Sequence, residues 1–293
     1  MASLSLIQNR FFSKLLLTLK MIKVQHSIFA LPFALTSVLI ASNGNLQLLD
    51  LVMIVLAMVT ARNAAMTFNR IVDLKIDKKN PRTANRELPS GMLSKKFATI
   101  FCLVNIILFI AISYYFNQLT FILSPVALMI VLGYSLTKRF TYYTQFFLGL
   151  ALGISPLAAW IAITGQLSFF AVLLGVNLFF WVAGFDLIYS TLDYAYDKKN
   201  GLKNLVVKWG LKKSLILARL FHFISFLSLV IAGIIQNLGL YYFIGCSIIG
   251  ALLYYEHRLV KPDDLSKVNM AFFTLNGYIS LLFLIFVVID FYI

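Results

Sequence analysis

Long apolar stretches take up nearly all of the 293-residue chain, and they constrain its fold more than any other feature. A helix needs about 20 apolar residues to cross a bilayer core about 30 Å thick. By hydropathy, nine stretches meet this need: 24–42, 48–68, 97–116, 119–137, 140–163, 166–189, 214–235, 238–255 and 270–292. Since 61% of the residues are hydrophobic and only 12% are charged, the composition excludes a soluble globular protein. We therefore predict an all-α, polytopic membrane bundle of nine transmembrane helices.

The polar segments between these stretches are short. The longest lie at about 69–96 and 187–213, whereas a separate soluble domain of ordinary size needs about 50 residues or more. The sequence therefore predicts a single integral-membrane domain over residues 1–293, with two polar motif regions at 69–91 and 186–210.

The basic residues predict the orientation of the chain. Lys and Arg occur in the N-terminal segment and after the second, fourth, sixth and eighth predicted spans, and the remaining Arg62 and Arg219 lie near the same ends of their spans, so all 25 are on one side. Cytoplasmic loops of membrane proteins carry such an excess. We expect a multi-pass protein of the inner (cytoplasmic) membrane, with a cytoplasmic N-terminus and the motif regions at the cytoplasmic face. The basic N-terminal segment would also suit an organelle transit peptide, which makes the mitochondrial inner membrane the less favoured alternative.

The net charge of +14 comes from these basic residues. The orientation rule and the attraction to anionic lipid headgroups are enough to account for them. We therefore expect the lipid bilayer as a partner and no nucleic acid, and the sequence implies no protein partner. Cys102 and Cys246 fall inside apolar stretches, where free thiols behave as small hydrophobic groups. Of the histidines, we expect His222 in the packed core and His257 at the membrane interface, whereas His26 is a candidate for substrate contact.

A charged cassette occurs twice, as DLKIDKKN from Asp73 and as DYAYDKKN from Asp193. In the first copy, Asn69, Asp73 and Asp77 are spaced four residues apart, so one helical face carries all three. Arg62 precedes Asn69 by about two turns and shares this face. Because Pro81 disfavours helical geometry in the residue before it, the first helix is predicted to end at Asn80.

The second copy predicts a matching arrangement. Asp186, Tyr189, Asp193 and Asp197 are spaced three, four and four residues apart and share one helical face. Gly201 is placed to end this helix. The two copies thus present carboxylates on similar faces at the ends of the second and sixth predicted spans.

Two interpretations of the cassettes compete. The aspartates could pair with neighbours such as Lys75, Lys78 or Lys198 in a solvated surface network. Alternatively, they could bind Mg²⁺, which prefers oxygen ligands and is usually held by one or two carboxylates together with substrate phosphates. The nearby Lys and Arg side chains suit the phosphate oxygens. The duplication of the cassette on matching faces favours the metal–phosphate interpretation.

The two motif regions resemble a known family. Residues 61–91, ARNAAMTFNRIVDLKIDKKNPRTANRELPSG, and residues 184–210, GFDLIYSTLDYAYDKKNGLKNLVVKWG, are similar to the two signature regions of the UbiA-type intramembrane aromatic prenyltransferases. The likeness is greatest to the 4-hydroxybenzoate polyprenyltransferase branch. HSIFALPFAL at 26–35 resembles the pattern of the family's first span, and Tyr134 with Lys138 in GYSLTK matches its Y-x-x-x-K element.

This resemblance implies a Mg²⁺-dependent enzyme. It would transfer a polyprenyl group from a prenyl diphosphate to a hydroxyaromatic acid similar to 4-hydroxybenzoate, in respiratory quinone biosynthesis. The implied catalytic residues are Asn69, Asp73, Asp77, Asp186, Asp193 and Asp197, of which Asp73, Asp77, Asp193 and Asp197 would bind Mg²⁺ through the diphosphate. The implied substrate-binding residues are Arg62, Tyr134, Lys138, Tyr189, Arg82 and Arg86.

Two positions depart from the family pattern. Asn69 is followed by Arg70 where many relatives have Asp, and Asn204 stands where Ser is expected. The first departure also occurs in a hydroxybenzoate-type subgroup associated with menaquinone made by an alternative route, so it bears on the acceptor more than on the reaction. A fused-ring naphthoate is the leading alternative acceptor. The isoprenoid chain length is open.

Other classes of protein fit the sequence less well. A secondary transporter would place its site near the bilayer midplane, whereas these aspartates follow the spans at their cytoplasmic ends. A non-catalytic assembly subunit would not need two metal-spaced sets of carboxylates.

Overall fold

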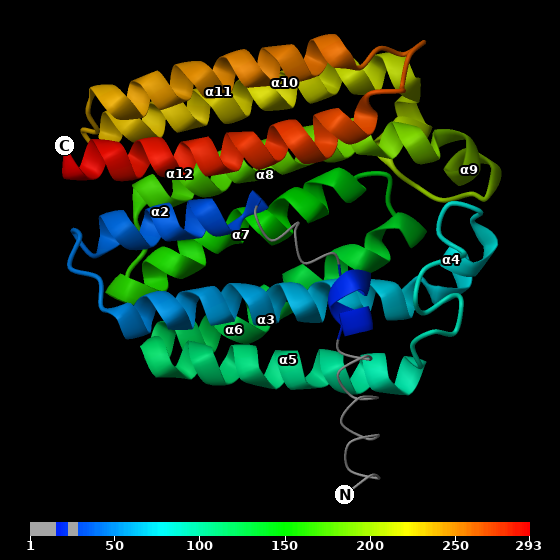
Figure 1. The fold of residues 1–293 in the computed structure, drawn as a ribbon, viewed down its shortest axis with the longest axis horizontal. Helices are drawn as coiled ribbons and strands as arrows, with labels where there is room; N and C mark the ends of the chain where they lie inside the picture. The colour runs from blue at the N-terminus through cyan, green and yellow to red at the C-terminus, as the bar shows by residue number, and fades with distance from the viewer. Residues whose placement is uncertain (1–15, 23–28) are drawn as a thin grey trace, which may run out of the picture.

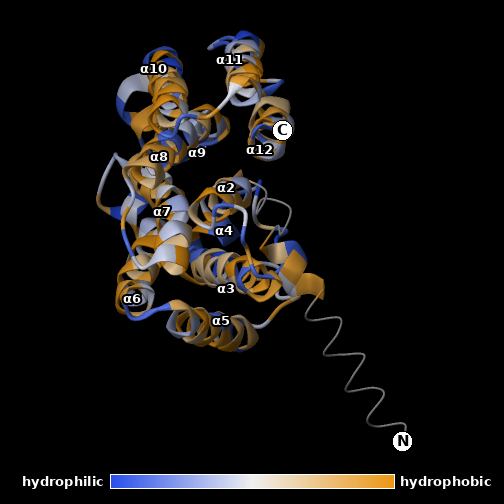
Figure 2. Cartoon of the chain, turned by 90° about the vertical axis from the view of Figure 1, so that its left-hand side faces the viewer, coloured by the Kyte–Doolittle hydropathy of each residue, from blue (hydrophilic) through white to orange (hydrophobic). Residues whose placement is uncertain are grey.

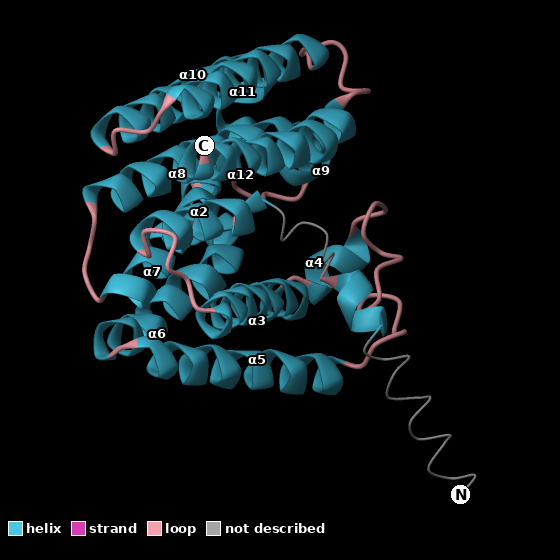
Figure 3. Ribbon diagram, turned by 60° about the vertical axis from the view of Figure 1, so that its left-hand side comes forward, coloured by secondary structure: helices cyan, strands magenta, loops and turns pink. Residues whose placement is uncertain are grey.

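The computed structural model describes residues 16–22 and 29–293, and within these residues the fold is all-helical, without a strand (Figure 3). The predicted all-α class is therefore confirmed. The named helices are α2 (Leu31–Ala41), α3 (Leu48–Val72), α4 (Leu74–Lys79), α5 (Lys95–Phe116), α6 (Gln118–Gly133), α7 (Thr144–Thr164), α8 (Phe169–Ser190), α9 (Tyr194–Lys199), α10 (Leu205–Ile235), α11 (Leu240–Leu259) and α12 (Asn276–Tyr292). Two 3-10 turns, η2 (Tyr134–Arg139) and η3 (Thr191–Asp193), and a π-helical turn, η4 (Met270–Leu275), complete the described chain.

The helices form a membrane bundle. Within the described residues, seven helical segments are long and apolar enough to cross a bilayer. The predicted count of nine is not confirmed: the first predicted span contains only the 11-residue α2 and extends into residues outside the described chain. The eighth corresponds to α11, which has 20 residues but ends in polar side chains at Glu256, His257 and Arg258. Hydrophobic residues run along the outer helices (Figure 2), as lipid contact requires.

The ends of the two cassette helices agree with the sequence. The helix α4 ends at Lys79, and Asn80 has extended geometry with ψ 118°, as Pro81 predicts. After α9, Gly201 adopts a left-handed conformation with φ 68°, which a glycine tolerates without strain.

The expectation of one uninterrupted helix through each cassette is wrong. The α-helix is interrupted at Asp73 in the first copy and over the 3-10 turn Thr191–Asp193 in the second. Asp73 separates α3 from α4 with φ −88° and ψ 0°, and Asp193 precedes α9 with φ −99° and ψ 2°. Both values lie in the sparsely populated bridge region, where active-site residues are often found. Spacing alone did not reveal this break because contacts with other elements stabilise it, as described below.

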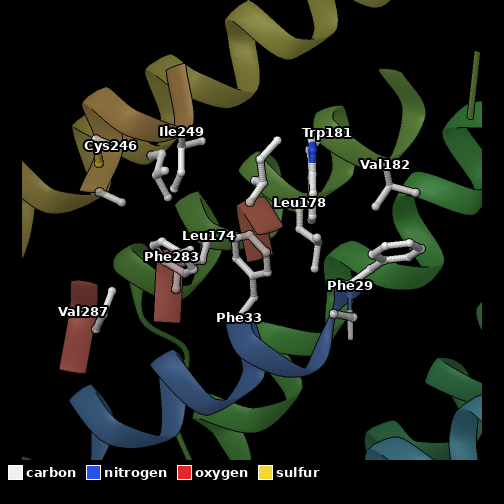
Figure 4. Packing of buried hydrophobic residues seen from close by; sticks show 14 of the residues in the cluster. Phe29, Phe33, Leu174, Leu178, Trp181, Val182, Cys246, Ile249, Phe283 and Val287 are labelled. Carbon is white, nitrogen blue, oxygen red and sulfur yellow. The ribbon is translucent and has the colours of Figure 1, made fainter. Parts of the chain in front are cut away.

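A large hydrophobic core surrounds α8, which connects the two halves of the bundle. Figure 4 shows Phe33 packed between Trp181 of α8 and Phe283 of α12, with Phe29 on the other side of Trp181. On its other side, α8 approaches α7 closely: a Cβ added to Gly153 would lie only 2.8 Å from the backbone oxygen of Gly175. Small residues allow such close packing of membrane helices. The end of α8, which carries Asp186 and Tyr189, is thereby held in place.

A buried polar network fixes α8 to α11 and α12. The indole Nε1 of Trp181 donates to Oδ1 of Asn276 at 2.8 Å, and Nδ2 of Asn276 lies 3.2 Å from Oε1 of Glu256. The same amide also donates to the carbonyls of Ala271 and Phe272 in the π-helical turn. The side chain of Asn276 therefore stabilises this turn.

The remaining predictions on single residues have mixed outcomes. His222 is buried in the core, and Cys102 and Cys246 are buried free thiols, as predicted. His257 is half-buried and lines a cavity between α10 and α11. His26 lies outside the described residues.

We expect replacement of Asn276 by Leu to lower the free energy of unfolding by about 2–4 kcal/mol, because it leaves the buried Trp181 N–H and Glu256 without their partner. Chemical unfolding in detergent micelles measures this change. Gly277→Ala is the matched control, since a Cβ there meets nothing within 4 Å. Equal stability of the two variants would show that the network does not support the fold.

Candidate active site

The two cassettes lie next to each other at one end of the bundle, which we call the motif end. Figure 1 shows α4 and α9 at this end, on the right of the view. The hydroxyl of Tyr196 in α9 lies 3.5 Å from the backbone oxygen of Ile76 in α4. Residues far apart in the sequence therefore form one surface.

Arg82 joins the two motif regions directly. It follows α4, and its Nε donates to Oδ1 of Asp193 at 2.9 Å while a second guanidinium nitrogen binds the other carboxylate oxygen. Its remaining nitrogen donates to the hydroxyl of Tyr189 at 3.0 Å. Burial lowers the pKa of Arg82, but the charges and hydrogen bonds of Asp193 and Tyr189 outweigh it, so the pKa is raised. The guanidinium is thus a permanent cation between the two regions.

Basic side chains from other elements also neutralise the first cassette. Asp73 is only 3% exposed, and it accepts from Nζ of Lys138 at 2.5 Å and from Arg139 at 3.1 Å. Asp77 is buried as well and accepts from Arg86 at 3.0 and 3.1 Å. These contacts hold η2 and the loop after α4 against the cassette. They also explain why the helix breaks at Asp73.

The surface-network interpretation named different partners. Lys75, Lys78 and Lys198 are exposed, and within the described chain none of them forms an ion pair with an aspartate. Asp73, Asp77 and Asp193 are instead paired with Lys138, Arg139, Arg86 and Arg82, which lie outside the cassettes.

The two departures from the family pattern both have structural partners. Nδ2 of Asn204 donates to Asp197 at 2.7 Å, while Oδ1 accepts from the backbone N–H of Val207 and caps α10. Asn therefore performs the capping role open to Ser and also binds the second cassette. The buried Arg70 contacts Oδ1 of Asn69 at 3.5 Å, and its Nε donates to the carbonyl of Met21 at 3.4 Å. Arg70 thus attaches the N-terminal segment to the site.

A cavity of about 350 Å³ begins beside the cassettes and extends between the helices. Its polar end includes Arg62, Arg70 and Arg86 together with Asp186, and the aromatic side chains of Phe29, Phe185 and Phe272 line its apolar part. The buried Nε of Arg62 has no hydrogen-bond partner among the described residues. A cavity with one charged end and an apolar body is shaped for an amphipathic ligand.

Eleven of the twelve predicted site residues line this cavity or connect to it through hydrogen bonds, and the twelfth, Asp197, binds Asn204, which does not line it. Arg62, Asn69, Arg86, Tyr134, Asp186 and Tyr189 line it. Hydrogen bonds connect Asp73 to it through Asn69, Asp77 through Arg86, and Arg82 with Asp193 through Tyr189; Lys138 binds Asp73, and Asp197 binds Asn204.

The sequence interpretation missed three residues of the site. Arg139 binds Asp73 and directly follows Lys138, so its position beside a predicted residue was an available signal. Gln145 of α7 donates to the hydroxyl of Ser190 and thereby supports the end of α8. Phe272 stacks on Tyr189 with ring centroids 4.2 Å apart. No sequence signal identified Phe272, because its direction depends on the π-helical turn.

The donor set suits Mg²⁺ bound together with a phosphate ligand. The cassettes offer carboxylate and amide oxygens, the ligands that Mg²⁺ prefers. Among the described residues, no three carboxylate, imidazole or thiol groups converge to enclose a metal ion by themselves. The oxygen donors present fit the ion, and substrate phosphates and water would complete its coordination.

Comparison with known proteins decides the family. The sequence model of the UbiA prenyltransferase family matches residues 30–282. The chain belongs to this family. It is 31% identical over 258 residues to the 4-hydroxybenzoate octaprenyltransferase of Francisella tularensis subsp. mediasiatica, covering 88% of this chain and 90% of that protein. The enzyme of the same name from Vibrio atlanticus is 30% identical over 247 residues, which cover 84% of this chain and 86% of that protein.

Solved structures of UbiA homologues share the fold. The apo structure of a homologue from Aeropyrum pernix K1 superposes with a TM-score of 0.82 at 28% identity, covering 90% of this chain and 98% of that chain. A homologue from Archaeoglobus fulgidus, solved with GPP and Mg²⁺, has a TM-score of 0.73 at 21% identity and covers 94% and 100% of the two chains.

For this UbiA family member we expect Asp73→Asn and Asp193→Asn each to remove most prenyl transfer, by roughly 100-fold or more, and the double variant to be scarcely worse. The reason is that both side chains would serve one site, and residues that act as a unit are strongly non-additive. Steady-state kinetics of the four proteins, with detergent chromatography as the folding control, measure the coupling. Two mild losses that multiply would mean that the cassettes act separately.

Proposed function

We propose that this protein transfers a polyprenyl group from a prenyl diphosphate to a hydroxybenzoate-like acid, in the membrane and in respiratory quinone biosynthesis. The observation that carries the proposal is the convergence of both cassettes on a single cavity with a charged end and an apolar, aromatic body. The name shared by the Francisella and Vibrio relatives supports the reaction and the acceptor.

The charged end would bind the diphosphate. Asp73 and Asp77 of the first cassette and Asp193 and Asp197 of the second would hold Mg²⁺ with the phosphate oxygens, as GPP and Mg²⁺ in the Archaeoglobus structure suggest by analogy. When bound, Mg²⁺ neutralises negative charge on the diphosphate leaving group and so favours its departure. Lys138, Arg139, Arg82 and Arg86, which now lie on the carboxylates, are close enough to exchange these partners for phosphate oxygens.

The aromatic part of the cavity would protect the reaction. Breaking the allylic C–O bond leaves a diphosphate and a prenyl cation, which water would quench. Phe29, Phe272, Tyr134 and Tyr189 line the cavity and exclude water from it. A ring carbon ortho to the hydroxyl of the acceptor then forms the new C–C bond. We assign the proton lost from that carbon to Asp186, since this cavity carboxylate has no ion pair within the described chain.

Arg62 is our candidate for binding the carboxylate of the acceptor. It lines the cavity, and among the described residues it forms no ion pair with a cassette aspartate. A guanidinium whose Nε is buried without a partner needs an anion, which the aromatic acid supplies. A naphthoate would present the same carboxylate on a larger ring, so it remains the alternative acceptor.

The proposed location follows from the basic loops. We take the whole chain as one integral-membrane domain of the inner membrane, with a cytoplasmic N-terminus and the motif end at the cytoplasmic face. A soluble aromatic acid and the diphosphate could then reach the site from the cytoplasm while the isoprenoid tail stays in lipid.

The reaction is tested with purified protein in nanodiscs, labelled prenyl diphosphate, and a panel of 4-hydroxybenzoate and hydroxynaphthoate acceptors. We expect a prenylated 4-hydroxybenzoate to form, turnover to stop on addition of a chelator, and Mg²⁺ to restore it, because the metal assists departure of the diphosphate. A heat-inactivated sample is the control. Full turnover in metal-free buffer would overturn the diphosphate mechanism, and a product only from the naphthoate would change the acceptor.

For Arg62→Lys we expect the KM of the acceptor to rise by about 10-fold or more while the KM of the prenyl diphosphate changes little, because an ammonium cannot form the bidentate contact with a carboxylate. Initial rates with each substrate varied in turn separate the two constants. Lys267→Arg, at an exposed position, is the matched control. An unchanged acceptor KM would return Arg62 to a structural role.

A further inference from the structure

A second cavity, of about 700 Å³, lies between α10 and α11 and shares no lining residue with the active-site cavity. These two helices form the outer edge of the bundle, at the top of Figure 1. In a membrane this edge faces lipid. The proposed prenyl transfer makes no use of the second cavity, so its chemistry requires a separate explanation.

Basic groups lie at the motif end of this cavity. Arg219 of α10 and Arg258 of α11 are exposed there, and within the described chain neither forms an ion pair with a carboxylate. Arg258 donates to the hydroxyl of Tyr254 at 3.3 Å. The half-buried His257 lies beside them, and its buried Nε2 has no hydrogen-bond partner among the described residues. Among the described residues, two cations thus lie beside an imidazole at this end of the cavity without an ion-pair partner.

Among the described residues, no acidic side chain forms an ion pair with Arg219, Arg258 or His257. Glu256 is adjacent in sequence, but its side chain is fully buried beneath the cavity. There it accepts from Asn276 and lies 3.6 Å from Nδ1 of His222, which forms part of the cavity wall. Its carboxylate therefore belongs to the core network described above. The cationic end of the cavity is left for a ligand from outside the chain.

The rest of the cavity is apolar and open to the membrane. Phe223 is 58% exposed and Tyr254 is 66% exposed, and Phe226 and Leu253 continue the wall. Gly250 shapes the inner part, since a Cβ there would lie 2.9 Å from the ring of Phe226. A groove with cations at one end and an apolar wall along its length matches a phospholipid, and basic pockets between transmembrane helices bind anionic headgroups.

We propose that this groove binds one anionic diacyl phospholipid. Its phosphate lies between Arg219 and Arg258, beside His257, and one acyl chain covers Phe223 and Phe226. Such a lipid bridges α10 and α11 and, because it binds only the folded protein, stabilises it increasingly as the lipid concentration rises above Kd. The inference does not depend on the proposed prenyl transfer, because the two cavities are separate.

The probe is phosphatidylglycerol added to protein in a neutral detergent, with phosphatidylcholine and inorganic phosphate as separate arms. Native mass spectrometry counts retained lipid, and thermal unfolding reports stabilisation. We expect one tightly retained phosphatidylglycerol and a raised Tm, weaker retention of phosphatidylcholine, and no effect of phosphate alone. Arg219→Gln with Arg258→Gln should weaken phosphatidylglycerol binding by about 10-fold or more, since each basic residue contributes to the attraction.

The matched control removes two charges from the same helix outside the groove. Lys212→Gln with Lys213→Gln should change retention by less than about twofold, because exposed charges are screened by salt. Ser247→Trp keeps both arginines but fills the apolar part from an exposed position, and it should also abolish retention. Three results would each overturn the proposal. These are equal binding of phosphatidylglycerol by the arginine and lysine variants, retention of phosphatidylcholine equal to that of phosphatidylglycerol, and a rise in Tm with free phosphate equal to that with phosphatidylglycerol.

Discussion

The arrangement of the motif end depends on one electrostatic constraint, which is that several carboxylates must be held together at the edge of an apolar bundle. Charged groups near a membrane interior are costly unless they are paired. Here each ion pair joins different segments: Arg82 binds Asp193, Arg86 binds Asp77, and Lys138 with Arg139 binds Asp73. The pairs that neutralise the charge therefore also assemble the site from the loop after α4, η2 and the end of α8.

The same balance suits the proposed substrate. A prenyl diphosphate joins a strongly anionic group to an isoprenoid tail, and the cavity joins a charged end to aromatic walls. Metal binding to the carboxylates would free the basic side chains for the phosphates, so the total charge stays balanced as the site fills. We propose this exchange as the reason that a largely apolar protein contains two copies of a charged cassette.

The sequence predicted the parts of this structure that depend on local chemistry. Pro81 and Gly201 set the ends of the cassette helices because their backbone geometry is intrinsic, and the i, i+4 spacing identified the carboxylates. The breaks at Asp73 and Asp193 were not predictable, because ion pairs with distant residues accompany them. Phe272 reaches Tyr189 through a π-helical turn that Asn276 stabilises, and this turn depends on tertiary hydrogen bonds.

The central claim is that the two cassettes bind one diphosphate. The most direct measurement is an experimental structure of the protein with Mg²⁺ and a prenyl thiolodiphosphate, which binds but reacts slowly. We predict a single diphosphate that lies between the two cassettes, with Asp73 and Asp77 on one side and Asp193 and Asp197 on the other. We also predict that Arg82 leaves Asp193 and binds a phosphate oxygen. A diphosphate bound at only one cassette, with Arg82 still paired to Asp193, would contradict this account.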